Sequence, residues 1–266
     1  MKNLHCTADY HMHSAFSDDS QAPMEDMILR AVALGLDEIC FTEHVDYGVK
    51  TVVNCDYPAY FTELERLRAK YRDQIAIRRG IEFGVQLETI PLYEADAQGG
   101  DFDFILLSNH QIGNQEFWNQ EFQAGKSQEE FHTAYYQAIF NVMGRFRHYS
   151  VLGHLDMIKR YDNLGPFPDK KVLPLIEKIL RRAIDDGKGI EVNTSSFRYG
   201  LPDLTPSREI LALYHQLGGR ILTIGSDAHS PDQLGDHIPQ VRAILKDMGF
   251  REFCTFEKMQ PVFHPL

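Results

Sequence analysis

The sequence lacks the features that mark disulfide-stabilised, secreted and membrane-spanning proteins. No apolar stretch approaches the roughly 18 residues that a membrane span needs, and the first ten residues lack the apolar core of a secretion signal. The few cysteines form no CxxC pair, which excludes a zinc ribbon and indicates reduced thiols at Cys6, Cys40, Cys55 and Cys254. We therefore expect a cytoplasmic protein with no membrane partner.

Positive charge is also scarce, and this limits the partners. The chain has 27 lysines and arginines against 38 acidic residues, a formal net charge of -11. Without a basic stripe, this charge opposes the long-range field that binding to duplex nucleic acid requires. A small phosphorylated partner stays compatible, because bound divalent cations and one or two arginines can reverse the local field. The oligomeric state stays open.

Length and pattern predict an α/β barrel. The 266 residues, 43% of them hydrophobic, fit one domain over residues 1–266, close to the roughly 250 residues of a TIM-like barrel. Apolar runs of strand length alternate with segments of helical period, as in parallel strands joined by right-handed crossovers. The seven expected strands are 6–12, 37–42, 75–82, 103–108, 150–154, 189–194 and 221–226.

Local signals place helices between these strands. Pro23 opens one of them and Gly35 closes it, positions that suit a first helical turn and a left-handed cap. The predicted helices are 23–35, 57–73, 127–146, 170–186, 206–217 and 236–248, and 84–99 is a further candidate that Pro91 interrupts. An edge strand is expected at 252–257. The irregular insert at 111–126 is typical of a lid or substrate loop.

Histidines gather where the predicted strands end. Six of the twelve stand within a few residues of such an end: His11, His13, His44, His110, His154 and His229. His11 and His13 are two residues apart on a strand, so both imidazoles face the same side and one metal ion can take both. Alone, an HxH pair is weak evidence for a metal site.

Acidic residues complete the pattern. Glu82 stands in GIEFG, and Asp227 shares a face with His229 in GSDAH. Groups at the carboxyl ends of barrel strands meet on one face although they are distant in sequence. Six strands then supply ligands, which predicts one polynuclear metal site at the mouth of the barrel.

The motifs HMHSAFSDDS, FTEH, GIEFG, SNH, GHLD and GSDAH resemble, in this order, those of the polymerase and histidinol phosphatase (PHP) superfamily. The similarity spans almost the whole chain, and its length resembles that of the stand-alone histidinol-phosphate phosphatases of this superfamily. The resemblance implies a distorted (β/α)7 barrel, TIM-like, with up to three metal ions at the C-terminal ends of the strands.

By position, the resemblance also implies the ligands. One metal ion would be held by His11, His13, Glu82 and Asp227, and a second by Glu82, His110 and His154, with Glu82 as the bridge. A third would be held by Asp19, His44 and His229, with Asp18 solvated or capping the next helix. Imidazole and carboxylate ligands without thiolate suit Zn, Fe or Mn, and the sequence does not separate these metals.

Two bridged ions would acidify a shared water, and the resulting hydroxide is the predicted nucleophile. Arg160 and Arg198 lie on strand-end loops, where planar guanidinium groups match phosphate oxygens, so we predict that both bind substrate. The predicted catalytic residues are Glu82, Arg160, Arg198 and His229. The acid for the leaving group stays open between His229, Asp156 and a metal-bound water, and Asp156 is also a candidate for orienting a ligand imidazole.

Three functions fit these features. The first is a metal-dependent phosphomonoesterase that hydrolyses L-histidinol phosphate in histidine biosynthesis. The second is a PHP phosphoesterase acting on a nucleotide or sugar phosphate, and the third is a non-catalytic metal-binding module. Residues expected to receive the cationic histidinol group are Glu116, Trp118, Glu121, Tyr161 and Phe197.

Overall fold

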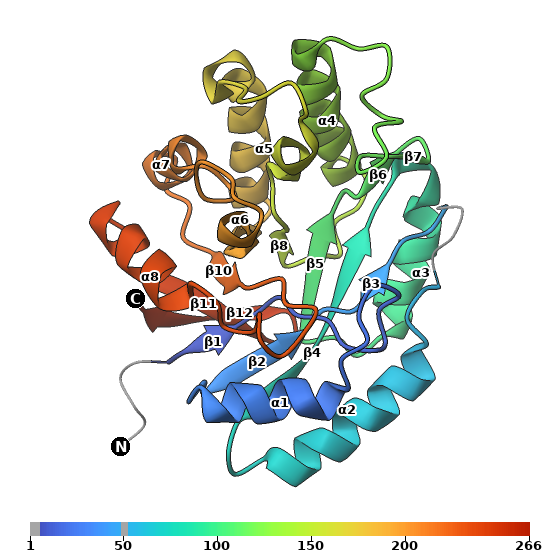
Figure 1. Ribbon diagram of the computed structural model, residues 1–266, viewed down its shortest axis with the longest axis vertical. Helices are drawn as coiled ribbons and strands as arrows, with labels where there is room; N and C mark the ends of the chain where they lie inside the picture. Colours follow the sequence, from blue (N-terminus) through green and yellow to red (C-terminus); the bar gives the residue numbers. More distant parts are fainter. Residues whose placement is uncertain (1–5, 49–52) are drawn as a thin grey trace.

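The computed structural model describes residues 6–48 and 53–266. Its main sheet is parallel and curves around the centre of the molecule (Figure 1), and β3 (His44–Val45) pairs with β4 beside this path. The strands along the sheet are, in spatial order, β1 (Ala8–Asp9), β2 (Glu38–Phe41), β4 (Ala76–Gly84), β5 (Phe104–Ser108), β8 (Val151–Leu152), β9 (Gly189–Asn193) and β10 (Leu222–Gly225). All seven predicted strands are present.

The two ends of the sheet meet and close the barrel. The backbone N–H of Tyr10 donates to the carbonyl of Ile224 at 3.0 Å, and the N–H of Asp227 donates to the carbonyl of His11 at 2.8 Å. These bonds join the segment that follows β1 to β10 and the segment after it. Closure brings the first and last histidine motifs of the chain side by side.

Helices lie around the outside of the strands (Figure 1). They are α1 (Met24–Ala33), α2 (Tyr57–Tyr71), α3 (Ile90–Gly99), α4 (Gln128–Met143), α5 (Leu173–Asp185), the short α6 (Ser195–Arg198), α7 (Arg208–Gln216) and α8 (Ile238–Asp247), with 3-10 turns η1 (Leu87–Thr89), η2 (Met157–Tyr161) and η3 (Asp169–Lys171). The six predicted helices are confirmed. Within residues 6–48 and 53–266, none of the helices combines the length and apolar character that crossing a membrane requires.

Caps and turns account for several element ends. Ser127 and Glu130 form a reciprocal capping box at the start of α4, which satisfies two free backbone donors. The candidate helix at 84–99 begins only at Ile90, after a 3-10 turn, because Pro91 fits the first helical turn but not the interior. The strand expected at 150–154 is shorter, since His154 has a φ of 20° and leaves the extended conformation.

The tail and the insert differ from the expected elements. The tail strand β11 (Glu252–Glu257) does not extend the barrel sheet, since it pairs with β12 (Gln260–Pro265) in a separate antiparallel hairpin. The insert at 111–126 is partly regular, because β6 (Gln111–Ile112) and β7 (Gln115–Glu116) form a short hairpin there. Neither hairpin follows from hydrophobic period alone.

Candidate metal centre

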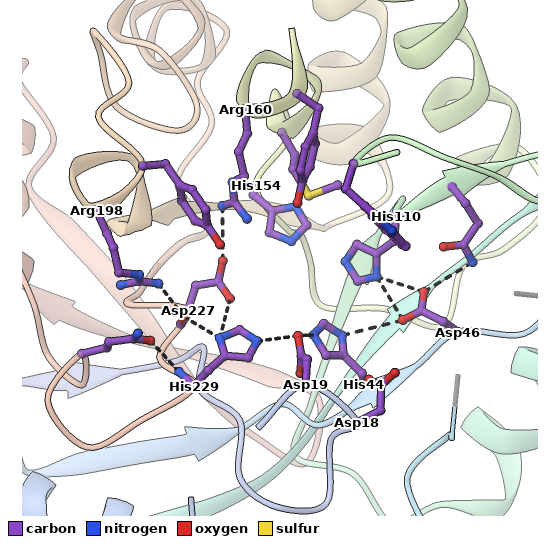
Figure 2. A pocket seen from close by; sticks show the side chains of 16 residues that line it. Asp18, Asp19, His44, Asp46, His110, His154, Arg160, Arg198, Asp227 and His229 are labelled. Carbon is purple, nitrogen blue, oxygen red and sulfur yellow. Dashed lines mark hydrogen bonds and ion pairs between the residues drawn. The ribbon is translucent and has the colours of Figure 1, made fainter. Parts of the chain in front are cut away.

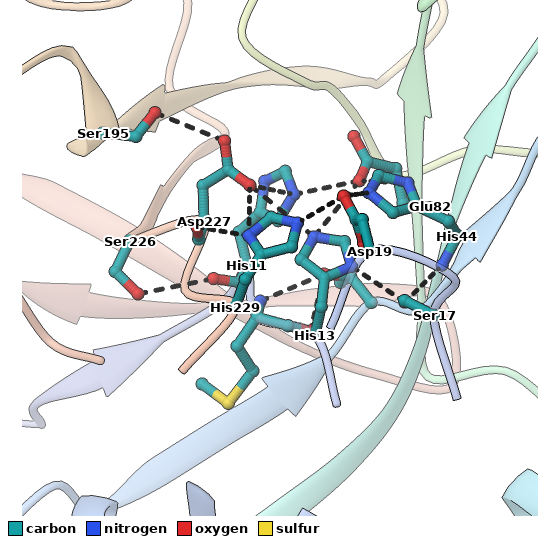
Figure 3. Close-up of polar contacts among 12 residues, drawn as sticks. His11, His13, Ser17, Asp19, His44, Glu82, Ser195, Ser226, Asp227 and His229 are labelled. Carbon is teal, nitrogen blue, oxygen red and sulfur yellow. Dashed lines mark hydrogen bonds and ion pairs between the residues drawn. The ribbon is translucent and has the colours of Figure 1, made fainter. Parts of the chain in front are cut away.

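The barrel brings all nine predicted metal ligands to the carboxyl ends of its strands (Figure 3, with His110 and His154 in Figure 2). Most stand in or just after a barrel strand, and Asp19 comes from the loop between β1 and α1. The nine residues are His11, His13, Asp19, His44, Glu82, His110, His154, Asp227 and His229. Side chains separated by more than 200 positions in sequence therefore share one site.

Glu82 lies at the centre of this group and is fully buried. Its Oε2 is 3.0 Å from Nε2 of His11 and 3.5 Å from Nε2 of His13. Its Oε1 is 2.9 Å from Nε2 of His154 and 3.2 Å from Nε2 of His110. Oε2 also lies 3.3 Å from Nδ1 of His44, so the two carboxylate oxygens face separate sets of imidazoles, which is the arrangement that a bridging ligand needs.

Two more carboxylates surround Glu82. Oδ1 of Asp227 is 3.6 Å from Nε2 of both His11 and His13. Oδ2 of Asp19 is 2.9 Å from Nε2 of His229 and 3.5 Å from Nε2 of His44. Asp19, and not Asp18, therefore stands between the two imidazoles of the predicted third position.

The donor atoms fit transition-metal ions. Nε2 of His13 and Nδ1 of His44 are buried and have no hydrogen-bond partner among the described residues. Burial lowers the pKa of His13 well below its ordinary value, and the imidazoles of His44 and His229 lower it further. A neutral imidazole keeps the lone pair that a metal ion takes. Nitrogen and oxygen donors without sulfur suit Zn, Fe and Mn.

The donor atoms can be grouped in more ways than the sequence predicts. Within each group all ligand atoms lie within 4.8 Å of one another. His13 joins the predicted third set, and Asp46, which the sequence analysis missed, forms a set with His44 and His110. The groups are His13, Asp19, His44 and His229; His11, His13 and Asp227; His11, Glu82 and His154; and His44, Asp46 and His110.

Both predicted arginines line the cavity of about 480 Å³ above these ligands (Figure 2). Nη2 of Arg160 donates to Oγ of Ser195 at 2.7 Å and to Oδ2 of Asp227 at 3.3 Å. Its guanidinium group also lies 3.8 Å from the ring centre of Tyr199. Nη2 of Arg198 donates to the carbonyl of Asp227 at 2.7 Å. Both guanidinium groups are therefore held beside the metal ligands.

The residues expected around the leaving group divide into two sets. Trp118 and Tyr161 line the cavity, whereas Glu116, Glu121 and Phe197 are not among its lining residues. Phe197 stacks on His237 at 4.2 Å between ring centres. The short β6–β7 hairpin brings Trp118 to the cavity, which sequence alone did not show.

Asp156 forms a buried ion-pair group with Lys159 and Asp169. Its Oδ2 is 2.8 Å from Nζ of Lys159 and accepts a hydrogen bond from the backbone of Ser207 at 3.0 Å. Lys159 also pairs with Asp169 at 2.6 Å. Within the described residues, Asp156 makes no hydrogen bond to a ligand imidazole, and it is not among the residues that line the cavity.

Two residues that the sequence analysis missed orient ligand imidazoles. Asp46 accepts from Nδ1 of His110 at 2.9 Å, and Glu191 accepts from Nδ1 of His11 at 2.6 Å. Both carboxylates are buried. The available signal for Glu191 is an acidic residue in the middle of an apolar strand, GIEVN, where burial of an unpaired charge is costly.

The chain is similar to known phosphatases over nearly its full length. Residues 9–195 match the PHP domain model. A histidinol-phosphatase of Lactococcus lactis subsp. lactis is 35% identical over 95% of both chains, and a probable histidinol-phosphatase of Thermotoga maritima is 31% identical over 91% of this chain and 92% of its own.

Solved structures are similar in fold. A crystal structure of the Lactococcus lactis histidinol phosphate phosphatase in complex with zinc, L-histidinol and phosphate has a TM-score of 0.89 and 32% identity, covering 96% of this chain and 98% of that one. A putative histidinol phosphatase from Listeria monocytogenes has a TM-score of 0.77 at 19% identity, covering 88% and 99%, and supports the fold alone. From the domain match and these relatives, the chain belongs to the PHP domain family.

Proposed function

We propose that this chain is a metal-dependent phosphomonoesterase that hydrolyses L-histidinol phosphate to L-histidinol and inorganic phosphate. The observation that carries the proposal is the position of Glu82. Its two oxygens face separate imidazoles, and two of these, His110 and His154, line the same cavity as Arg160 and Arg198. The similar Lactococcus lactis enzyme, crystallised with zinc, L-histidinol and phosphate, supports the substrate.

The nine predicted ligands are proposed to hold two or three Zn, Fe or Mn ions. When bound, such ions supply Lewis acidity, which lowers the pKa of water and offsets the charge of a phosphoryl group. Glu82 and Asp227 provide the carboxylates nearest His11 and His13. His229 contributes Nε2 toward Asp19, while its Nδ1 donates to the carbonyl of Asp227 at 3.0 Å.

The two arginines are proposed to bind and orient the phosphate. Arg160 has a fixed position, because its Nη2 donates to both Ser195 and Asp227 and its guanidinium group lies against the ring of Tyr199. Nε of Arg160 is buried and has no hydrogen-bond partner among the described residues. A guanidinium group whose geometry is already set loses little entropy when it binds phosphate oxygens.

The opposite part of the cavity is proposed to receive the histidinol group. In Figure 2 Arg198 lies on one side of the cavity, and Asp18 and Asp46 lie across from it. Trp118 and Tyr161 also line this cavity and present aromatic surfaces. An anionic and aromatic wall suits a leaving group that carries an ammonium and an imidazole.

The test is phosphate release from a panel of monoesters. The protein is stripped with a chelator, reloaded with Zn, Mn or Fe, and assayed with L-histidinol phosphate, nucleoside monophosphates and sugar phosphates. We expect activity only after reloading and the highest kcat/KM for L-histidinol phosphate. A higher kcat/KM for a nucleotide or sugar phosphate would favour the second predicted function. If no loaded metal gives phosphate release from any substrate, the third predicted function, a non-catalytic metal-binding module, would be favoured.

A further inference from the structure

Glu191 lies inside the barrel, in the middle of β9, and is fully buried. Its Oε1 accepts from Nδ1 of His11 at 2.6 Å, and its Oε2 accepts from the backbone N–H of His154 at 2.8 Å. Nδ2 of Asn193 donates to the same Oε2 at 3.2 Å. One carboxylate therefore contacts two predicted ligands, the imidazole of His11 and the backbone of His154.

The contact with His11 determines which ring nitrogen is free. With Nδ1–H donating to Glu191, Nε2 of His11 carries the lone pair. That nitrogen lies 3.0 Å from Oε2 of Glu82 and 3.6 Å from Oδ1 of Asp227. Glu191 therefore aims the lone pair of His11 into the proposed first metal position.

The contact with His154 involves the backbone. His154 has a φ of 20°, a region that L residues rarely adopt and that persists only where neighbouring groups hold it. The charge-assisted bond from its N–H to Glu191 is such a restraint. The conformation places Nε2 of His154 2.9 Å from Oε1 of Glu82, in the proposed second metal position.

Packing around the pair leaves no room for another arrangement. A Cβ added to Gly225 would lie 2.5 Å from Oε1 of Glu191 and 2.3 Å from Cβ of His11. β10 must therefore carry glycine at this point for His11 and Glu191 to meet. A residue with a side chain at position 225 of this buried strand would therefore disturb the contact between His11 and Glu191.

We propose that Glu191 is a positioning residue that orients His11 and His154 together, so that it links the affinities of two adjacent metal positions. This inference rests on the proposed function, because that function supplies the metal ions. Loss of Glu191 should therefore weaken the binding of two metal ions.

The experiment compares Glu191→Gln and Glu191→Asp with the full-length wild-type protein, and Glu177→Gln, which changes a carboxylate on α5 that pairs with Arg181, is the control. Each is stripped, then equilibrated with zinc at buffered free concentrations, and bound zinc per chain is measured by mass spectrometry. Loss of an outer-shell partner typically costs about 10- to 100-fold in metal affinity. For Glu191→Gln we expect a loss of this size in two zinc-binding steps, and for Glu177→Gln we expect no loss.

A second measurement uses the wild-type protein and covers the case in which a variant does not fold. In ¹⁵N-histidine-labelled, zinc-loaded protein, the nitrogen shifts of His11 should show Nδ1 protonated and Nε2 bound to metal. An unprotonated Nδ1 of His11, or a folded Glu191→Gln variant with the zinc affinity of the wild type, would overturn the inference about Glu191 but not the proposed function. A wild-type protein that binds no metal overturns the proposed function as well.

Discussion

Replacing Arg160 by alanine tests the phosphate-binding side of the cavity. The side chain is 8% exposed, and it is held by Ser195, Asp227 and Tyr199 rather than by solvent. A hydrogen bond to a charged group contributes roughly 1.5–3 kcal/mol, and removing one donor to a transition-state oxyanion costs about 2.7–4 kcal/mol. We therefore expect Arg160→Ala to lose about 2–4 kcal/mol of transition-state stabilisation, roughly a 30- to 1,000-fold fall in kcat/KM.

The assay is steady-state phosphate release from L-histidinol phosphate, with metal content measured on the same samples because Arg160 contacts Asp227. Arg160→Lys keeps the charge but loses the planar fork, so its activity should lie between the wild type and alanine. Arg181→Ala is the matched control, since this exposed arginine pairs with Glu177 on α5. Full metal content with kcat/KM within threefold of wild type in Arg160→Ala would refute the reasoning.

Three further outcomes are expected. Arg198→Ala should lower kcat/KM at unchanged metal content, and equal kinetics would remove this residue from phosphate binding. Glu82→Gln should lower both bound metal and rate, because a neutral amide is a poor bridge between two cations; full metal content in this variant would contradict the bridging role. Lys159→Ala leaves Asp156 and Asp169 buried without their cation, so the free energy of unfolding in urea should fall by about 3–5 kcal/mol, and a loss under 1 kcal/mol would contradict this.

The strand pattern was sufficient to predict how the ligands converge. Parallel strands that alternate with helices end on one face, so residues such as His11, Glu82 and Asp227 had to meet once the barrel was recognised. The choice of Asp19 over Asp18 came from the resemblance to the family. The structure agrees with it, because only Asp19 lies between the imidazoles of His44 and His229.

Orienting residues were beyond the sequence for a physical reason. A ligand must stand where a strand ends, but its hydrogen-bond acceptor can come from any neighbouring element. Asp46 reaches His110 from a different strand end, and Glu191 reaches His11 from the middle of β9. The residues expected around the leaving group divide for a similar reason, since in the insert that carries the β6–β7 hairpin Trp118 lines the cavity and Glu116 does not.

Asp227 explains how a chain with a net charge of -11 can bind an anionic substrate. Its Oδ1 faces His11 and His13, while its Oδ2 accepts from Arg160. The same carboxylate therefore serves the proposed metal position and fixes the guanidinium group that we propose binds phosphate. Positive charge is needed only within this cavity, where bound cations and two held arginines dominate the local field. A basic surface would add attraction for many polyanions without improving the binding of one small phosphate ester.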